Sequence, residues 1–380
     1  MENNHLTYFK VENFKKFDSL EVNDIGQFNL IVGNNNVGKT CLLESLVLEF
    51  HAKKIISGLR HTFSKRNVKI DQSTKYLINQ QNFNYDYNLI GLVQKDKNKP
   101  ISIQRKLNDG EKTIYEIENL KEFNPTLRTD TNDFIKKVNL FQYVGINQIS
   151  KNWLVFKKEI RNELNDVIFN EVDFIADITS NYYLDFYYYS NYLPLVRIDD
   201  FYSSDIIFFF REIVKNPRDE DHLISIVRKI FEDIEIDRFS IIEYFNKVEY
   251  LNISTKKKTN YHPINEYGDG FVRIMSILFE VLYNKYNHIL IDEIEIGIHY
   301  SKMKDFWVNL MSVCKELNVQ LFATTHSNEC IESFMEASKE INEKNIRLIR
   351  LQENKDKSIK AICYKEEYIE YMVESNTEER

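Results

Sequence analysis

Residues 33–40 of the 380-residue chain, GNNNVGKT, have the spacing G-x-x-x-x-G-K-T. Glycines let such a loop turn tightly around an anion, so that backbone N–H groups and the N-terminus of the next helix point at phosphate oxygens. The lysine of this pattern bridges the β- and γ-phosphates of a nucleotide, and the threonine hydroxyl holds Mg²⁺. We predict that the following residues bind the nucleotide: Asn34, Asn35, Asn36, Val37, Gly38, Lys39, Thr40 and Cys41.

A second segment, residues 288–293 (HILIDE), is an apolar run that ends in two carboxylates. Ligands of open α/β sheets bind at the carboxyl ends of the strands. Asp292 is therefore predicted to share Mg²⁺ with Thr40, and Glu293 to accept a proton from the attacking water or to orient it. A strand that simply ends in a polar turn would look the same, but the phosphate-loop pattern upstream favours the functional interpretation.

Two further segments could contact phosphate. Residues 322–327 (FATTHS) place His326 after an apolar run, where it could sense the γ-phosphate as a third catalytic side chain beside Lys39 and Glu293. A lone histidine is more often structural, and its place one strand after the acidic pair favours function. Gly268 and Gly270 could form a second anion-binding nest at a helix N-terminus, or they could belong to an ordinary helix-capping turn.

The phosphate loop needs a strand before it and a helix after it. Residues 28–32 (FNLIV) are a continuous apolar run, as in a strand buried on both faces, and residues 39–51 are expected to form the helix. Residues 6–11 and 19–22 look like the first strands of a β-meander that continues into 28–32. The last third of the chain alternates regularly between helices (270–283, 302–317) and strands (288–292, 319–323, 347–351, 359–364).

The middle of the chain has no nucleotide motif. Its expected strands are 88–93, 101–105 and 113–117, and its expected helices are 133–138, 153–164, 204–214 and 221–231. Asp219 and Asp221 form a D-x-D pattern that could suggest a nuclease, but no apolar strand precedes it, so we interpret it as the start of a helix.

Composition excludes several classes of protein. The formal net charge is -8 with no long basic block, which disfavours wrapping of nucleic acid and leaves a local basic patch open. No apolar stretch approaches the roughly 18 residues that span a bilayer, and the N-terminus does not resemble a signal peptide, so we expect a cytoplasmic protein without a membrane partner. The four cysteines lack CxxC spacing and are expected to be free thiols: Cys41, Cys314, Cys330 and Cys363.

The phosphate loop, the turn with Gly268 and Gly270, the acidic pair and the segment with His326 follow one another in this order along the chain. In this order the four motifs resemble those of ABC-type ATPase heads, and most closely the SMC/RecF-like and OLD-like (overcoming lysogenization defect) group. The resemblance covers about the first fifty and the last hundred and twenty residues, including NEYGDGFVRIMSIL as a degenerate signature motif and VQLFATTHSNECI as the H-loop. Tyr267 stands where the signature usually has serine, and His299 stands where the D-loop often has aspartate. Gln142 and Gln148 are both candidates for the Q-loop glutamine.

The resemblance implies an α/β P-loop NTPase fold, an ABC-type head with a mixed sheet and a mainly helical insertion. We expect head segments at 1–52 and 261–380, separated by an insertion or arm with residual head strands at 53–260. It also implies Mg²⁺-dependent ATP hydrolysis in a homodimer or larger homo-oligomer, whose signature turns close on the partner's ATP. GTP is disfavoured because the chain has no N-K-x-D segment.

The same group suggests the biological role. OLD-like proteins often continue into a Toprim nuclease domain, for which we expect no room here, and stand-alone ATPases of the group act beside a separate effector in bacterial anti-phage defence. We therefore expect a sensor or scaffold that controls a nuclease or toxin. A RecF/SMC-like ATPase of DNA repair or maintenance is the alternative, and the ATPase subunit of a transporter is a third class that the long insertion disfavours.

Overall fold

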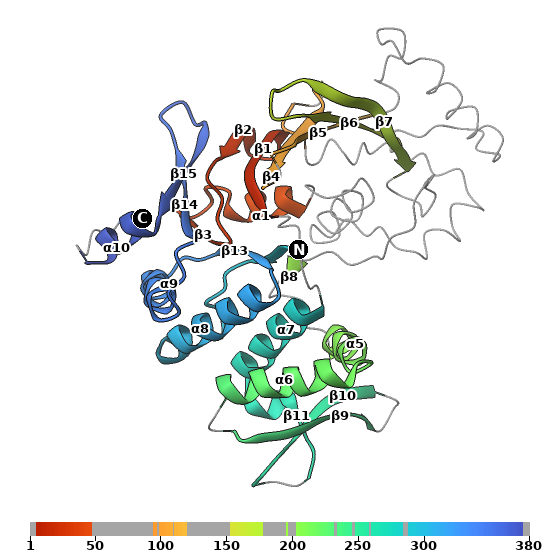
Figure 1. Ribbon diagram of the computed structural model, residues 1–380, viewed down its shortest axis with the longest axis vertical. Helices are drawn as coiled ribbons and strands as arrows, with labels where there is room; N and C mark the ends of the chain where they lie inside the picture. The colour runs from red at the N-terminus through yellow and green to blue at the C-terminus, as the bar shows by residue number, and fades with distance from the viewer. Residues whose placement is uncertain are drawn as a thin grey trace, which may run out of the picture.

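The computed structural model describes residues 5–47, 94–96, 99–108, 110–119, 153–177, 195–196, 203–231, 234–244, 248–257, 260–283 and 288–374. Expected elements at 88–93 and 133–138, and both candidate Q-loop glutamines, lie outside these residues. The described part forms three sheets with helices packed against them (Figure 1).

The sheet that carries the motifs is central and nearly all parallel. Its strand order is β15 (Ile359–Lys365), β14 (Ile346–Glu353), β3 (Phe28–Gly33), β13 (Gln320–Thr324), β12 (His288–Ile291) and β8 (Leu195–Val196). Strands β14 to β8 pair in parallel, and β15 is an antiparallel edge strand. The carboxyl ends of β3, β13 and β12 therefore meet at one edge of the sheet, which is the edge that the motifs require.

The expected β-meander is wrong at its third strand. Strands β1 (Leu6–Phe14) and β2 (Phe17–Val22) form an antiparallel hairpin, but β3 leaves them and pairs in parallel with β13 and β14. Five consecutive residues of β3, from Phe28 to Val32, are buried. A strand that is apolar on both faces is stable only where both faces are covered, which the central position provides.

The hairpin instead opens a second, antiparallel sheet. Its order is β2, β1, β4 (Ile101–Leu107), β5 (Lys112–Asn119), β6 (Trp153–Arg161) and β7 (Val167–Asp177). The helix expected at 153–164 is therefore wrong, because β6 pairs with both β5 and β7. Its sequence WLVFKKEIR is rich in aromatic and β-branched residues, and a short apolar run of this kind fits a helix or a strand until its pairing partners are known.

Most expected helices are confirmed. The described helices are α1 (Lys39–Val47), α5 (Ser203–Ile213), α6 (Pro217–Ile230), α7 (Asp269–Tyr283), α8 (Tyr300–Glu316), α9 (Asn328–Glu340) and α10 (Glu366–Glu374). The Asn216 side chain caps α6, and Pro217 opens it, so the D-x-D pattern at Asp219 and Asp221 is the start of a helix as interpreted. The sequence did not predict α10.

The central sheet separates two hydrophobic cores. From β3, Phe28, Leu30 and Val32 enter a core shared with helices α5 to α9, whereas Ile31 enters a core shared with α1 and the antiparallel sheet. This alternation follows the period of two in a strand. Figure 1 accordingly shows the antiparallel sheet and the group α5 to α8 on opposite sides of the central strands.

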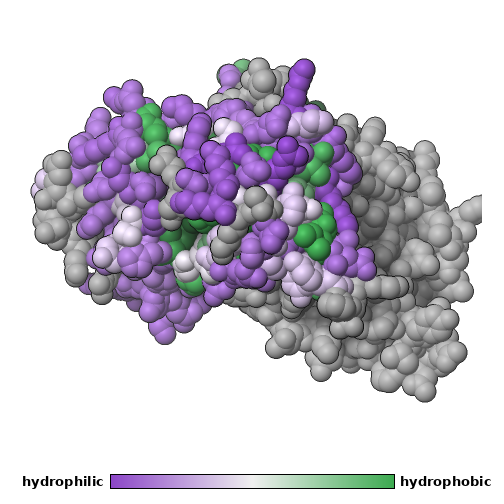
Figure 2. Space-filling model, turned by 90° about the horizontal axis from the view of Figure 1, so that it is seen from below, coloured by the Kyte–Doolittle hydropathy of each residue, from purple (hydrophilic) through white to green (hydrophobic). Residues whose placement is uncertain are grey.

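A third, small sheet lies beyond the helices. Its order is β11 (His262–Pro263), β10 (Val248–Thr255) and β9 (Ile236–Tyr244), and it packs against α5 and α6. Viewed from this end, the described surface is mostly hydrophilic with small separate hydrophobic spots (Figure 2). None of the described helices has the length and hydropathy needed to cross a membrane, and all four cysteines are free thiols.

Candidate functional site

The glycine loop between β3 and α1 is fixed by close packing. Gly33 and Gly38 have φ values of +143° and +115°, a range that side chains rarely adopt. A Cβ on Gly33 would lie 2.5 Å from the carbonyl oxygen of Leu351, and a Cβ on Gly38 would lie 3.1 Å from the Phe17 ring. Gly33 is therefore needed for space as well as for backbone conformation, whereas Gly38 is needed mainly for its backbone conformation.

Lys39, the first residue of α1, lies beneath this loop and is only 5% exposed. Its Nζ donates to the carbonyl oxygen of Gly33 at 2.6 Å and lies 3.3 Å from Nδ1 of His326. Burial lowers the pKa of Lys39 from its ordinary value, and the negative charges of Asp292, Glu293 and Glu295 oppose that shift. The ammonium group thus lies between the glycine loop and the acidic segment after β12, which comprises residues 292–295.

The hydroxyl of Thr40 connects the glycine loop to the end of β12. It donates to Oδ2 of Asp292 at 3.1 Å, and Oδ1 of Asp292 accepts a second bond from the Thr324 hydroxyl at 2.6 Å. The Thr324 oxygen in turn accepts from the backbone N–H of Glu293 at 2.7 Å. Residues from β3–α1, β12 and β13 therefore meet in one hydrogen-bonded chain.

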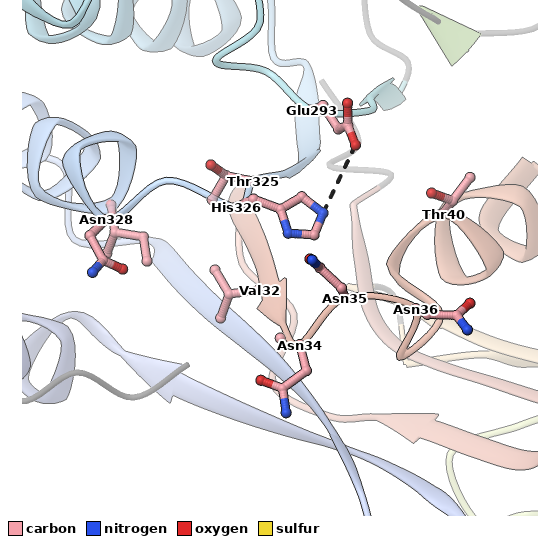
Figure 3. A pocket seen from close by; sticks show the side chains of 11 residues that line it. Val32, Asn34, Asn35, Asn36, Thr40, Glu293, Thr325, His326 and Asn328 are labelled. Carbon is pink, nitrogen blue, oxygen red and sulfur yellow. Dashed lines mark ion pairs between the residues drawn. The ribbon is translucent and has the colours of Figure 1, made fainter.

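Glu293 and His326 face each other across the same space (Figure 3). Nε2 of His326 lies 3.9 Å from Oε1 of Glu293. The backbone N–H of His326 donates to Oε1 of Glu295 at 2.7 Å, so the segment after β12 also holds the segment after β13. Glu293 itself has a φ of +49°, a strained conformation for a non-glycine residue.

A cavity of about 860 Å³ opens over these groups. The described residues that line it are Val32, Gly33, Asn34, Asn35, Asn36, Thr40, Glu293, Thr325, His326, Asn328 and Ile331. Figure 3 shows Asn34 to Asn36 on one side of the cavity, and Glu293 and His326 on the other. The expected residues Val37, Gly38 and Cys41 belong to the loop and α1 but lie outside this lining, whereas Lys39 and Asp292 are joined to lining residues by the bonds described above.

A model of the AAA ATPase domain family matches residues 5–331, which include the glycine loop, the acidic segment and His326. The chain belongs to this family. Membership makes the protein an ATPase, and it agrees with a P-loop fold that has mixed α/β sheets.

One curated relative and two solved structures resemble this ATPase at low sequence identity. A Helicobacter pylori protein named "ATP/GTP phosphatase" is 22% identical over 351 residues, which cover 85% of each chain. Among solved structures, the SMC head domain from Thermotoga maritima has a TM-score of 0.42 at 10% identity, over 95% of this chain and 99% of that one. A Pyrococcus furiosus Smc head bound to the C-terminal domain of ScpA has a TM-score of 0.43 at 9% identity, over 98% and 99%. These scores are low, so the assignment rests on the family model.

The glycines of the expected signature turn lie outside the cavity lining of this ATPase. Gly268 has no heavy atom within 4 Å of where its Cβ would be, and its φ is +92°. Gly270 abuts the carbonyl oxygen of Gly297, 2.3 Å from a Cβ built on it. His299, the expected D-loop residue, caps α8 by accepting from the Ser301 N–H. Neither Gly268 nor Gly270 is among the residues that line the cavity.

Sequence reasoning missed several groups at the site of the ATPase. Glu295 and Thr324 hold the neighbouring loops through hydrogen bonds, and Asn328 and Ile331 line the cavity from α9. Polar residues directly after an apolar strand were the available signal for Glu295 and Thr324. Asn328 and Ile331 had no such signal, because their place depends on how α9 packs.

The residues present fit a bound magnesium ion. Among the described residues, no group of three or more His, Cys, Asp or Glu could hold a metal by itself. Mg²⁺ beside ATP needs only one or two protein oxygens, since phosphates and water supply the rest. The Thr40 hydroxyl and the Asp292 carboxylate, 3.1 Å apart, are the hard oxygen ligands that such an ion takes.

Proposed function

We propose that this ATPase binds the triphosphate of ATP over residues 33–41 and hydrolyses it with Glu293 as the general base. The observation that carries this proposal is the Thr40–Asp292 hydrogen bond. It joins the phosphate loop to an acidic strand more than 250 residues away in the sequence, with Glu293 and His326 beside it. Nothing in a simple structural turn would require that convergence.

The side chains then have separate tasks. Lys39 neutralises charge on the β- and γ-phosphates, and the N–H groups of Asn34 to Gly38 bind their oxygens. Thr40 and Asp292 would hold Mg²⁺, which supplies charge neutralisation on the phosphates. Glu293 takes a proton from the attacking water, and His326 donates a hydrogen bond to the γ-phosphate. This requires His326 to carry a proton on the nitrogen that faces the phosphate.

We propose in addition that two copies close on two ATP molecules in an isologous dimer. Gly268 and Gly270 lie apart from the cavity of their own chain, yet they sit at the N-terminus of α7, which favours an anion. Ile296 and Tyr300 near this turn are 44% and 70% exposed. A second copy could therefore receive the turn over its γ-phosphate.

The biological role that we propose is a cytoplasmic sensor or scaffold that controls a separate effector, a nuclease or a toxin, in anti-phage defence. Its support is the resemblance to stand-alone OLD-like ATPases. The alternative is a RecF/SMC-like ATPase that acts in DNA repair or maintenance. The two differ in a measurable way, because a DNA-dependent ATPase is stimulated by DNA and loses that stimulation steeply as salt rises.

The catalytic proposal is tested with Glu293→Gln, which keeps the size of the side chain and removes its basicity. We expect ATP turnover to fall by about a hundredfold or more, while the affinity for ATP with Mg²⁺ persists and ATP-dependent dimers accumulate in light-scattering measurements. Normal turnover by Glu293→Gln would refute the assignment of the base.

The role is tested with the wild-type protein and double-stranded DNA over a series of salt concentrations. Turnover that does not respond to DNA, together with co-purification of a nuclease or toxin from the native host, would support the sensor. Stimulation by DNA that disappears with salt would favour the alternative.

A further inference from the structure

The backbone of Glu293 is held at both of its polar groups. Its N–H donates to the Thr324 hydroxyl oxygen at 2.7 Å, and its carbonyl oxygen accepts a hydrogen bond from Nη2 of Arg273. With a φ of +49°, Glu293 occupies a conformation that costs about 1–3 kcal/mol and persists only where the surroundings impose it. The two hydrogen bonds are such a constraint, and they determine which way the carboxylate leaves the chain.

Arg273 belongs to a different part of the molecule. It lies on α7, three residues after Gly270, and its side chain is 2% exposed. Gly270 packs directly on the carbonyl oxygen of Gly297, and a Cβ on Gly297 would lie 3.7 Å from Cδ of Arg273. The first turn of α7 and the segment after Glu293 therefore touch with no space between them, and Arg273 crosses that contact to reach Glu293.

A buried guanidinium group is costly unless its charge and its N–H groups are used. One N–H group of Arg273 donates to the carbonyl oxygen of Glu293, the one strained non-glycine residue of the acidic segment. Catalysis is sensitive to this geometry, because a shift of about 1 Å in a catalytic group can cost about a hundredfold in rate.

We propose that Arg273 is a positioning residue that orients Glu293 and ties its place to that of the first turn of α7. This inference rests on the proposed role of Glu293 as the base. When a phosphate is captured at Gly268 and Gly270, any movement of α7 is passed through Arg273 to the Glu293 backbone. Phosphate capture on one surface and water activation in the cavity are then linked within one chain.

The experiment is a double-mutant cycle that combines Arg273→Met or Arg273→Lys with Glu293→Gln. Methionine keeps the length of the side chain and removes every donor, whereas lysine keeps the charge and one donor group. We expect Arg273→Met to lower kcat by about tenfold or more. The kcat of Arg273→Lys should lie between those of the wild type and Arg273→Met. In both variants the Kd for ATP with Mg²⁺ should change by less than about threefold. In the Glu293→Gln background, neither change should lower the residual rate by more than about twofold.

Ser276→Ala is the matched control. Ser276 is also buried on α7, one turn further on, but its hydroxyl donates to Val272 within the helix. It should leave kcat unchanged within about twofold. If Arg273→Met does not fold, Arg273→Lys provides the same test, with a smaller expected decrease in kcat.

Two results would overturn the inference: unchanged kcat in both Arg273 variants, or an equal loss with and without Glu293→Gln. The second result would assign Arg273 to general stability. A Glu293→Gln variant with normal turnover would instead refute the proposed base, so the two proposals fail separately.

Discussion

The charge on Lys39 depends on two opposing influences. Burial beneath the glycine loop favours the neutral amine, and three nearby carboxylates favour the ammonium ion. The first influence is the larger, so the pKa of Lys39 lies below its ordinary value of 10.5. Among these carboxylates, Glu295 has no proposed part in the reaction. It is therefore suitable for testing how the carboxylates affect the pKa of Lys39.

Because Lys39 must be charged to bind phosphates, we expect kcat/KM to fall as pH rises, beginning below pH 10.5. Glu295 raises the pKa of Lys39, so Glu295→Gln should move this alkaline decline to lower pH. The amide oxygen of glutamine can still accept from the His326 N–H. The measurement is a profile of kcat/KM against pH, which reports groups of the free enzyme.

Glu332→Gln serves as the control for that profile, since Glu332 is an exposed carboxylate on α9. It should leave the alkaline decline where it is in the wild type. A decline that moves to higher pH in Glu295→Gln, or that shifts equally in both variants, would contradict the account of Lys39.

Among the elements, β13 has two functions. Its carboxyl end delivers Thr324 and His326 to the cavity, and its first residue joins the sheets. Gln320, which is fully buried, donates to the carbonyl oxygens of Leu6 and Gly26 and accepts from the Leu6 N–H. One side chain thus fixes the start of β1 against the strands that carry the site.

We expect Gln320→Leu to lower the free energy of unfolding by about 2–3 kcal/mol, because the Leu6 N–H and carbonyl groups lose this buried partner, whereas the Gly26 carbonyl oxygen keeps its hydrogen bond from Asn29. Denaturant unfolding followed by circular dichroism measures this change. Gln352→Leu on β14 is the comparison, since Gln352 is exposed and should change stability by less than about 0.5 kcal/mol. Equal effects of the two substitutions would contradict the role given to Gln320.

The contact between α7 and the segment after β12 gives a second prediction for the elements. In Gly270→Ala the new Cβ would lie 2.3 Å from the Gly297 carbonyl oxygen, so the first turn of α7 must shift. We expect kcat to fall by about tenfold, as for other displaced catalytic geometry, with ATP binding to the single chain retained. Steady-state kinetics measure the decrease in kcat, and ATP titration measures the affinity of the single chain for ATP. Weakened ATP binding with normal kcat would contradict the expectation.

For the whole molecule, the question is how two copies meet. The proposed dimer places the turn before α7 and the segment 296–300 against a partner, and Tyr300 in that segment is 70% exposed. Tyr300→Asp in the Glu293→Gln background should abolish the ATP-dependent dimer. Light scattering of the protein with and without ATP and Mg²⁺ measures this.

Leu164→Asp is the control for the dimer. Leu164 is 83% exposed at the turn between β6 and β7, on the antiparallel sheet. It should leave the mass of the ATP-bound species unchanged. A dimer that survives Tyr300→Asp, or that Leu164→Asp breaks equally, would place the interface elsewhere.

The sequence by itself determined the parts of the protein that depend on neighbouring residues. The strand 28–32, the glycine loop and the start of the helix after it follow from local pattern, because the loop needs positive φ values and close packing that only glycine permits. The apolar runs before Asp292 and His326 likewise predicted strands that end in polar groups, and the family match confirms the P-loop ATPase fold.

The tertiary structure decided what depends on partners distant in sequence. The run at 153–161 became a strand because β5 and β7 flank it, and β3 left the expected meander because β13 and β14 cover its edges. Arg273 and the strained backbone of Glu293 gave no local signal, and the polar residues after the apolar strand did not show which loop Glu295 would hold. Their roles come from hydrogen bonds that join α7, the segment after β12 and the end of β13, and only the folded chain brings these three segments together.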